Sequence, residues 1–406
     1  MSTTRRGRRL RVQLWSYNYA PEPTGIGPVS TALAEGLRDM GHVVEVVSAH
    51  PHYPEPRWGA RRIPYRESRN GIRVLRLPLW VGRATATQRI RQELTFTSSA
   101  LAALPFLGTP DVLVAASPSF PALFPAVLSS RIRRVPLVIW LHDILPEGAM
   151  ATGLVGNGPV LRASRWLERT AYRTASRIVV LSGSFLDTLR AKNVREDKLQ
   201  LIYDPATLQP SEHGHGHREA GDGRRVICMG NIGHSQGLPP LVRAFERSEE
   251  IRSAGVQLVV TGTGVAEGDV RRQIRSDAVK MLGLISEEEL DRELRLATLA
   301  LVSQEHEGTE FNLPSKLMNY MAYGLPIIAA VNAQSEVARL VSDSGCGWIA
   351  DSSNPEIFPR TVVKAMGESE ELRRRGQAGR GFASKHFGRD AFAARFDSLL
   401  LDAVRE

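Results

Sequence analysis

The fold is decided by the opening stretch, residues 10–47, which reads LRVQLWSYNYAPEPTGIGPVSTALAEGLRDMGHVVEVV. Apolar and polar residues alternate over 10–14, which predicts a strand. After a glycine-containing loop, apolar residues recur at helical spacing as far as Gly41, and 43–47 predicts the next strand. This order of strand, turn, helix and strand is a βαβ unit, so the sequence predicts a parallel sheet covered by helices.

The same alternation recurs along the chain and divides it into two parts. Buried strands are predicted at 112–115, 137–140, 178–181, 226–229, 257–260, 299–302 and 326–330. Periodicity is lost between the third and fourth of these, and 406 residues favour two domains over one. We predict an α/β protein with two Rossmann-like domains, whose parallel sheets face a central cleft. The expected divisions are a domain at 1–205, a linker at 206–223, a domain at 224–387 and a C-terminal helix at 388–406 that packs back towards the first domain.

Composition indicates a folded protein of the cytoplasm. Hydrophobic residues make up 42% of the chain and charged residues 23%. The two cysteines, Cys228 and Cys346, have no second thiol or histidine at ligand spacing, so we expect inert thiols in a reducing compartment. The basic first residues are followed by a short strand-like run, 10–15, and not by the apolar region of a signal peptide. The most apolar stretch, 100–128, is interrupted by several prolines and does not predict a membrane-spanning helix.

The net charge of +9 is unevenly distributed. Ten arginines lie between Arg57 and Arg91, where Glu67 is the one acidic residue. Three interpretations compete: a solvated face, attraction to anionic lipid or a phosphorylated substrate, and nucleic-acid binding. No recognition helix or zinc-finger pattern accompanies the charge, so nucleic acid is not an expected partner.

Three glycine turns follow predicted strands, at 25–27, 230–233 and 262–264. Glycine lets backbone N–H groups approach a phosphate at a helix N-terminus, so each turn is a candidate anion cradle. None completes the dinucleotide-binding pattern, and an ordinary tight turn without a ligand is the alternative for each.

A more informative stretch, 311–327, reads FNLPSKLMNYMAYGLPI. Pro314 predicts a helix start and Gly324 its end. Ser315 and Lys316 then stand at a helix N-terminus, where a diphosphate gains from dipole, hydroxyl and ammonium together. The alternative is an ordinary capped helix.

Another polar pair, His142 and Asp143, follows the strand predicted at 137–140. Ligands of open α/β sheets bind at the carboxyl ends of strands, so the pair could orient a sugar hydroxyl or move a proton. A hydrogen bond within a loop is the alternative.

Taken in order, the turn at Gly25–Gly27, the Ser-Pro turn at Ser117, the 143–147 segment, the 230–238 loop and the 314–326 stretch resemble the family 4 retaining glycosyltransferases. The resemblance covers about residues 10 to 390 and is strongest for the branch that builds bacterial capsule, O-antigen and exopolysaccharide. It implies the two-domain GT-B fold, with the nucleotide-sugar held mainly by the second domain and the acceptor by the first.

By this resemblance His142 and Asp143 are the catalytic residues, and which of the two matters more stays open. Gly27 and the 230–237 loop would approach the diphosphate, Gly262, Gly264 and the turn at Leu284 the base, Ser315 and Lys316 the phosphates, and residue 319 the ribose. The implied donor-binding residues are Gly25, Gly27, Gly230, Asn231, Gln236, Gly237, Gly262, Gly264, Leu284, Glu310, Ser315, Lys316 and Asn319.

The chain departs from the family pattern at three places. The usual glutamate pair, eight positions apart, falls on Phe311 and Asn319, which leaves Glu307 or Glu310 to replace the first glutamate. A lysine that often precedes glycine in the 230 loop is Gln236 here, so Lys316 carries more of the phosphate charge. The capsule branch often has Arg-Asp in place of His142-Asp143.

The expected function is hexosyl or N-acetylhexosaminyl transfer, with retention, from a nucleotide-sugar, most naturally a UDP-sugar, to a small-molecule or lipid-linked glycan acceptor. No cofactor is expected, and no metal, since carboxylates do not cluster at metal spacing; His213, His215 and His217 lack a carboxylate partner. We expect a cytoplasmic enzyme, peripheral to an anionic membrane. The alternatives are a nucleotide-sugar 2-epimerase and a non-catalytic polyanion- or membrane-binding protein.

Overall fold

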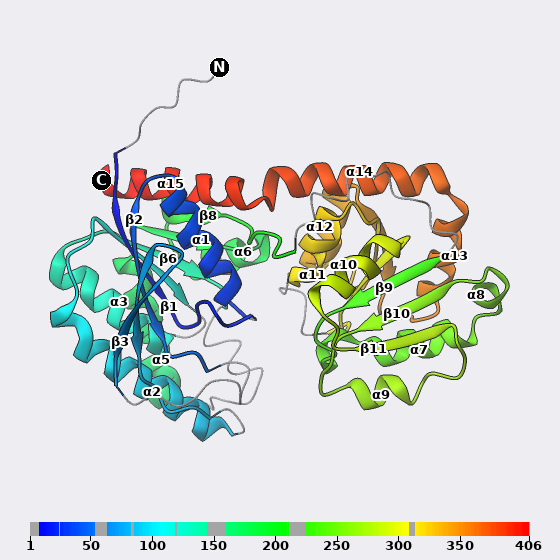
Figure 1. Ribbon diagram of the computed structural model, residues 1–406, viewed down its shortest axis with the longest axis horizontal. Helices are drawn as coiled ribbons and strands as arrows, with labels where there is room; N and C mark the ends of the chain where they lie inside the picture. The colour runs from blue at the N-terminus through cyan, green and yellow to red at the C-terminus, as the bar shows by residue number, and fades with distance from the viewer. Residues whose placement is uncertain are drawn as a thin grey trace, which may run out of the picture. The chain divides into compact units, whose positions relative to one another are not determined.

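The computed structural model describes residues 8–23, 25–52, 63–82, 85–117, 120–143, 159–208, 210, 224–307 and 313–405. Its contacts divide the chain into two compact units (Figure 1). Unit 1 consists of Met1–Asp204 and Arg389–Glu406, and unit 2 of Pro205–Gly388. The chain therefore leaves unit 1, completes unit 2 and returns to unit 1 with its last helix.

Within the described residues, unit 1 holds an eight-stranded sheet in the order β3-β4-β2-β1-β5-β6-β7-β8. Its strands are β1 (Arg11–Ser16), β2 (Val43–Ala49), β3 (Tyr65–Arg69), β4 (Ile72–Leu77), β5 (Val112–Ser117), β6 (Leu137–Leu141), β7 (Arg177–Val180) and β8 (Leu199–Leu201). Its helices are α1 (Gly27–Asp39), α2 (Ala86–Ala103), η1 (Leu104–Phe106), α3 (Phe120–Arg133), α5 (Pro159–Thr174), α6 (Gly183–Ala191), η2 (Glu196–Lys198) and α15 (Arg389–Arg405). The βα alternation is the reason for the parallel pairing of the inner strands.

One edge of this sheet differs from the all-parallel arrangement predicted from sequence. β3 pairs antiparallel with β4, with Arg69 opposite Ile72. The two residues between them, Asn70 and Gly71, have φ of 49° and 76°, the left-handed backbone that two-residue hairpin turns require. The Asn-Gly signal lies inside the arginine-rich stretch, where no hairpin is predicted.

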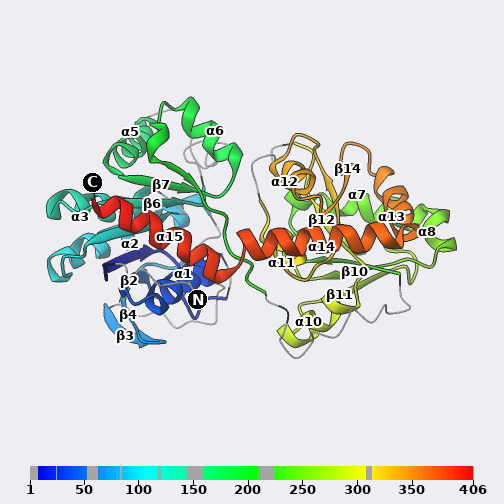
Figure 2. The ribbon, with the colours of Figure 1, turned by 90° about the horizontal axis from the view of Figure 1, so that it is seen from above.

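Apolar layers cover both faces of the unit 1 sheet. On one face, α1 and α15 pack together through residues such as Leu33, Leu37, Phe392 and Phe396. Figure 2, seen from above, shows α15 running over the same side of the sheet as α1. The other face is covered by α2, α3, α5 and α6, whose buried side chains include Phe96. Both faces of the sheet are therefore covered by helices, as in doubly wound α/β domains.

Unit 2 holds a six-stranded parallel sheet in the order β11-β10-β9-β12-β13-β14, counted over the described residues. Its strands are β9 (Arg225–Met229), β10 (Gln257–Thr261), β11 (Val279–Gly283), β12 (Leu299–Ser303), β13 (Ile327–Val331) and β14 (Gly347–Asp351). Its helices are η4 (His234–Gln236), α7 (Leu238–Arg247), α8 (Glu249–Ser253), α9 (Glu267–Arg271), α10 (Glu287–Leu296), α11 (Ser315–Ala322), α12 (Glu336–Ser344), α13 (Ile357–Gly367) and α14 (Ser369–His386). The capping box that starts α10, formed by Ser286 and Glu289, is present as its sequence indicates.

The seven strands predicted from apolar runs all form, each within two residues of its expected ends. Both cysteines are free and buried. None of the described helices combines the length and the hydropathy that a bilayer-spanning segment requires. The fold thus confirms the α/β class predicted from the sequence, with parallel sheets apart from the β3 edge.

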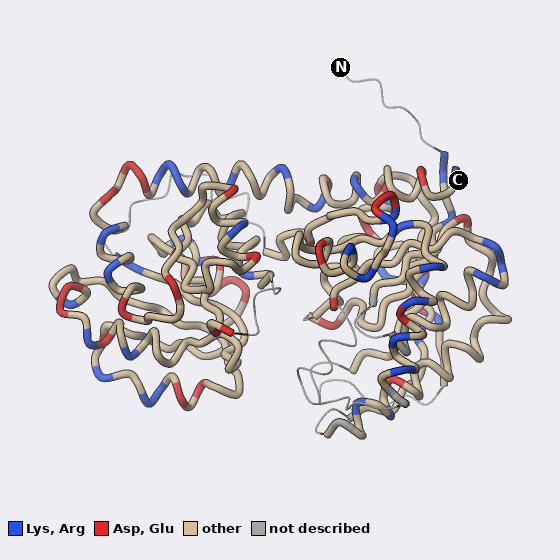
Figure 3. The backbone as a smooth tube through the Cα atoms, turned by 180° about the vertical axis from the view of Figure 1, so that it is seen from behind, with Lys and Arg blue, Asp and Glu red and all other residues tan. Residues whose placement is uncertain are grey.

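Not all arginines of the stretch from Arg57 to Arg91 are exposed at the surface. Arg57, Arg61, Arg62 and Arg83 lie outside the described residues. Arg76 is fully buried; its guanidinium bonds the Glu67 carboxylate at 2.9 Å. Figure 3 shows Lys and Arg positions recurring along the helices of unit 1 as well. The charge of unit 1 is therefore not confined to the stretch that the sequence singled out.

Candidate functional site

Two glycine turns of unit 2 pack backbone against backbone where neighbouring strands end. Gly230 follows β9 and Gly262 follows β10, with φ of 108° and 120°. A Cβ on Gly262 would lie 1.9 Å from the carbonyl oxygen of Gly230, and one on Gly264 would lie 2.3 Å from that of Ile232. The backbone N–H of Ile232 donates to the carbonyl of Thr263 at 2.9 Å. Close packing of the two loops alone therefore requires both glycines of the second turn.

The first of these loops reaches the start of α11 through a side-chain hydrogen bond. The Lys316 ammonium donates to the amide oxygen of Gln236 at 2.7 Å. Gly237, with φ of 56°, is the N-cap residue of α7, and a Cβ there would lie 3.1 Å from the Glu305 carboxylate. Gly230, Gln236, Gly237 and Lys316 are thus brought together; with Ser315 we call them the α11 corner.

Lys316 is held rigidly at the N-terminal turn of α11. Ser315 and Lys316 are its first two residues, after Pro314 at the N-cap position. The neighbouring stripe of Leu317, Tyr320 and Met321 is buried, as predicted. The Tyr320 hydroxyl accepts the backbone N–H of Met229 at 2.7 Å, which ties the helix to the end of β9.

No carboxylate in the described part of the chain compensates the buried charge of Lys316. The residue is only 8% exposed, and among the described side chains no carboxylate forms an ion pair with it. Lysine is almost never buried unless it is paired. A buried ammonium beside a helix N-terminus, with a neutral amide as its neighbour, favours an anionic ligand.

The side chain of Asn319 forms hydrogen bonds with residues of its own unit. Its amide oxygen accepts the backbone N–H of Thr207 at 2.9 Å and that of Leu208 at 3.1 Å. Its amide nitrogen donates to the Thr207 hydroxyl at 3.2 Å. The side chain is buried, so the expected contact with a ribose would require these bonds to break.

Three further residues expected to bind the donor differ in where they lie: Asn231 adjoins Gly230 of the α11 corner, Leu284 follows another strand, and Glu310 lies outside the described residues. Leu284 is 75% exposed after β11, and Asn231 is exposed in the 230 loop. Glu307 is exposed, and Glu310 lies outside the described residues. Glu305, which the sequence analysis did not single out, is the carboxylate that packs against Gly237.

In unit 1 the predicted turn at Gly25–Gly27 opens α1 after β1. A Cβ on Gly27 would lie 2.8 Å from the carbonyl oxygen of Glu22, so the turn itself requires glycine. The buried Glu22 carboxylate accepts the backbone N–H of Tyr19 and of His52, at 3.2 and 2.9 Å. These contacts hold Glu22 without a ligand.

His142 and Asp143 follow β6, and the structure adds a third residue. The Nδ1 of His142 lies 3.6 Å from a carboxylate oxygen of Asp204, which follows β8. The Trp140 ring packs against the imidazole, with 4.5 Å between ring centres. His142 Nε2 and Asp204 Oδ1 are buried and have no hydrogen-bond partner among the described residues. Asp204 was missed because the three-residue strand before it gives too weak a pattern to predict.

Burial sets the protonation of this group. It lowers the pKa of His142 to about 3 and raises the pKa of Asp204 to about 8, because a charge on either side chain loses its hydration. It also raises the pKa of Asp143 to about 6. At neutral pH the imidazole is therefore uncharged and able to exchange hydrogen bonds with a hydroxyl.

No set of three or more His, Cys, Asp or Glu side chains in the described part of the chain is arranged to hold a metal ion. The three histidines of the 213–217 stretch lie outside that part. The chemistry of the two groups is thus that of a buried cation in unit 2 and a neutral imidazole with two carboxyl groups in unit 1.

Comparison with known sequences identifies both units. Residues 24–205 match the family of glycosyl transferase 4-like domains, and residues 223–368 match the family of group 1 glycosyl transferases. The WcaI protein of Escherichia coli, named for a glycosyl transferase of colanic acid biosynthesis, is 23% identical over 89% of this chain and 90% of its own. An MMP α-(1→4)-mannosyltransferase of Mycolicibacterium hassiacum is 26% identical over 97% of this chain and 98% of its own.

Solved structures share the fold. HepE of Anabaena, crystallised with UDP, superposes with a TM-score of 0.66 at 14% identity, covering 97% of this chain and all of HepE. Sucrose-phosphate synthase of Thermosynechococcus elongatus superposes with a TM-score of 0.70 at 17% identity, covering 97% of this chain and 98% of the synthase. Both likenesses concern the architecture of two α/β domains.

Proposed function

Because this chain belongs to the family 4-like glycosyltransferases of the GT-B type, we propose that it transfers a sugar from a nucleoside diphosphate, UDP above all, to an acceptor hydroxyl. We further propose that the anomeric configuration of the sugar is retained and that the sugar is a hexose or an N-acetylhexosamine. The observation that carries the proposal is the buried Lys316 at the N-terminus of α11, which bonds a neutral amide and forms no ion pair with a described carboxylate.

In this proposal the α11 corner holds the diphosphate of the donor. Lys316 and the backbone N–H groups at the N-terminus of α11 meet the phosphate oxygens. These groups gain most as the glycosidic bond breaks, because negative charge then accumulates on the leaving diphosphate. Gln236, already bonded to the ammonium at 2.7 Å, holds Lys316 in place before the donor arrives.

Two observations support UDP as the carrier. HepE, which shares the fold, is described in complex with UDP and, in another crystal, with UDP-glucose. The resemblance noted from the sequence points to the same base. Selectivity for uracil would then be set by the turns after β10 and β11, near Gly262 and Leu284.

His142 is the proposed contact to a reacting hydroxyl. Its neutral imidazole presents Nε2, which has no protein partner among the described residues. Asp204 faces the other ring nitrogen and orients the ring. Asp143, whose pKa is raised to about 6, is ionised at neutral pH and able to accept a hydrogen bond from the acceptor.

We propose a lipid-linked glycan as the acceptor; the relative WcaI is named for glycosyl transfer in colanic acid biosynthesis. Unit 1 exposes large apolar side chains on and beside α2: Trp80, Ile90, Leu94 and Phe106. The Arg91 guanidinium lies over the Trp80 ring at 3.7 Å. Aromatic and basic residues of this kind anchor proteins at the surface of anionic bilayers. We propose a peripheral position on the cytoplasmic side of the membrane.

We also propose that neither metal nor cofactor takes part, because Lys316 and the helix dipole supply the positive charge that a metal would otherwise provide. Activity unchanged by EDTA is the expected result. The matched families and relatives are named for glycosyl transfer, which favours this reaction over 2-epimerisation or polyanion binding.

The test is an assay of UDP release from UDP-glucose, UDP-galactose and UDP-N-acetylglucosamine, with and without a polyprenyl-diphosphate glycan acceptor. We expect acceptor-dependent UDP release from one donor, and proton NMR of the product should show the α anomer. An inverted product would contradict retention. Formation of an epimerised donor in the absence of acceptor would show that the enzyme is a 2-epimerase and would contradict the proposed transfer.

A further inference from the structure

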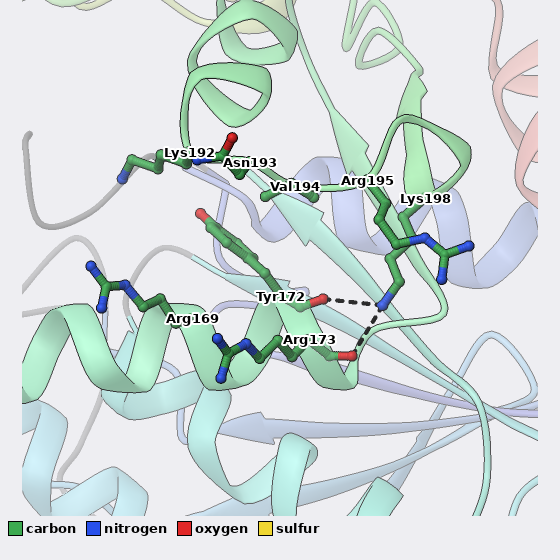
Figure 4. Close-up of a pocket in the computed structure, with 8 residues that line it drawn as sticks. All are labelled: Arg169, Tyr172, Arg173, Lys192, Asn193, Val194, Arg195 and Lys198. Atoms are coloured by element: carbon green, nitrogen blue, oxygen red, sulfur yellow. Dashed lines mark hydrogen bonds between the residues drawn. The ribbon is translucent and has the colours of Figure 1, made fainter.

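A cavity of about 370 Å³ lies in unit 1 between the end of α5 and the loop that joins α6 to β8 (Figure 4). Its volume is within the range of small-molecule sites, about 300–1,000 Å³. The lining residues are Arg169, Tyr172, Arg173, Lys192, Asn193, Val194, Arg195 and Lys198. Five of the eight are basic, and we call the cavity the α5 pocket.

The α5 pocket lies at the other end of the strands from His142, Asp143 and Asp204, which together we call the His142 group. Arg173 is close to the end of α5, just before β7 begins at Arg177, and Lys198 directly precedes β8. Both therefore stand at the starts of parallel strands. His142 follows the end of β6 and Asp204 the end of β8. The pocket is thus separate from the candidate active site within the same unit.

Positive charge in the pocket exceeds negative charge. Two carboxylates compensate basic residues of the lining: Glu168 pairs with Lys192, and Asp197 pairs with Arg195, each at 2.5 Å. Lys198 donates to the carbonyl of Arg173 at 3.0 Å and to that of Ala175 at 2.6 Å. Its pKa is lowered, first by burial and then by the charge of Arg195, as expected where cations crowd together.

The guanidinium groups of Arg169 and Arg173 have no partner among the described residues. Neither forms an ion pair or a side-chain hydrogen bond with any described residue. They lie one turn apart on α5, and Figure 4 shows both on the side of the helix that lines the pocket. Cations are favoured at a helix C-terminus, but Lys198 already bonds those carbonyls and Arg169 is not in the last turn. The helix dipole therefore accounts for Arg173 at most, and not for Arg169.

We propose that the α5 pocket binds a ligand bearing a phosphate group through Arg169 and Arg173. Two guanidinium groups present the forked donors that suit phosphate oxygens. Five basic residues against two carboxylates leave three uncompensated positive charges, which is closer to the charge of a phosphomonoester, about −1.5 to −2, than to that of a single carboxylate. The ligand is either a soluble phosphate compound or the headgroup of a phospholipid.

The first arm of the test is a titration of inorganic phosphate followed by ³¹P NMR line broadening, at ionic strength held constant with chloride. The pocket variant is Arg169→Gln/Arg173→Gln. The matched control, Arg162→Gln/Arg165→Gln, removes the same charge from exposed positions of the same helix that do not line the pocket. We expect the pocket variant to bind phosphate about tenfold more weakly or worse, and the control to bind like the wild type.

The second arm is co-sedimentation with phosphatidylcholine vesicles that contain phosphatidic acid. Loss of vesicle binding in the pocket variant alone, without phosphate binding in solution, assigns the pocket to a lipid headgroup. Loss in the first arm alone assigns it to a soluble phosphate compound. Equal behaviour of the pocket variant and the wild type in both arms, or equal loss in the pocket and control variants, would overturn the proposal.

Discussion

The two candidate groups are built in different ways. In unit 2 the α11 corner consists of backbone turns, a helix N-terminus and one buried cation, Lys316. In unit 1 the His142 group consists of ionisable side chains, and burial suppresses the charge of His142 and Asp204. The first arrangement is suited to holding an anion, and the second to exchanging hydrogen bonds or protons with a neutral hydroxyl.

The two groups also depend on different features of the fold. The α11 corner depends on backbone loops that approach more closely than any side chain would allow. The His142 group depends on two strand ends, those of β6 and β8, lying at the same edge of a sheet. Backbone changes should therefore damage unit 2 most, and changes of charge should affect unit 1 most.

The largest effect is expected from Gly262→Ala. The added methyl group would lie 1.9 Å from the Gly230 carbonyl oxygen, at a φ of 120°. We expect a loss of about 3–5 kcal/mol in stability and a nearly complete loss of nucleotide binding. Chemical unfolding and calorimetry measure both. Gly345→Ala is the control, with a left-handed φ but no atom within 4 Å, and should cost about 1 kcal/mol. Equal costs would contradict the close packing of the two loops.

The next effect concerns His142→Asn, which removes the imidazole but leaves a polar side chain. We expect kcat to fall about 100-fold while the KM for the donor stays within about twofold, since the donor phosphates are held by unit 2. Steady-state kinetics at saturating acceptor measures this. A rise in donor KM at constant kcat would mean that His142 binds the donor. That result would contradict the division of roles between the two units.

A smaller effect is expected from Asn319→Ala. The change strands the backbone N–H groups of Thr207 and Leu208, which should cost about 1–3 kcal/mol of stability. Donor KM should change little if these bonds are the main role of the side chain. A tenfold rise in donor KM with unchanged stability would instead support the ribose contact implied by the family resemblance.

The smallest effect is a pH dependence in Asp204→Asn. Burial raises the pKa of Asp204 in the folded protein to about 8, so its favourable contribution is complete below its ordinary pKa near 4 and is lost as pH rises through 8. The Asn variant does not titrate and so does not lose stability in this way. The Tm of the variant minus the Tm of the wild type should therefore increase by a few degrees between pH 5 and pH 8.5. The exposed Asp187→Asn serves as a control and should show no such trend. A constant difference in Tm would mean that Asp204 titrates normally.

Much of the fold could be predicted because long apolar runs, separated by glycine turns, specify buried parallel strands locally. The β3–β4 hairpin could not, since its strands are rich in arginine and only Asn70-Gly71 marks the turn. Lys316 could be found because Pro314 and Gly324 mark both ends of its helix in the sequence. Its lack of a counter-charge depends on tertiary packing and became visible only in the structure.

The remaining parts of the two groups lie beyond local sequence signals. Asp204 meets His142 through the order of strands in the sheet, and the strand before it spans only Leu199–Leu201. Gly262 and Gly264 were expected to hold a base, whereas the structure gives each a packing reason that needs no ligand. Whether they also contact a nucleotide stays a prediction. The α5 pocket joins residues of two helices and a loop, which no single spacing in the sequence reveals.

The most direct test of the central claim, that the α11 corner holds a nucleoside diphosphate, is calorimetric titration of UDP, GDP and ADP into three proteins. These are the wild type, Lys316→Ala, and Lys364→Ala, an exposed lysine of the same unit. We predict saturable binding of UDP to the wild type and the Lys364 variant, weakened about 10- to 100-fold in Lys316→Ala. Binding of equal strength to all three proteins, or no binding of any nucleotide to the wild type, would contradict the account.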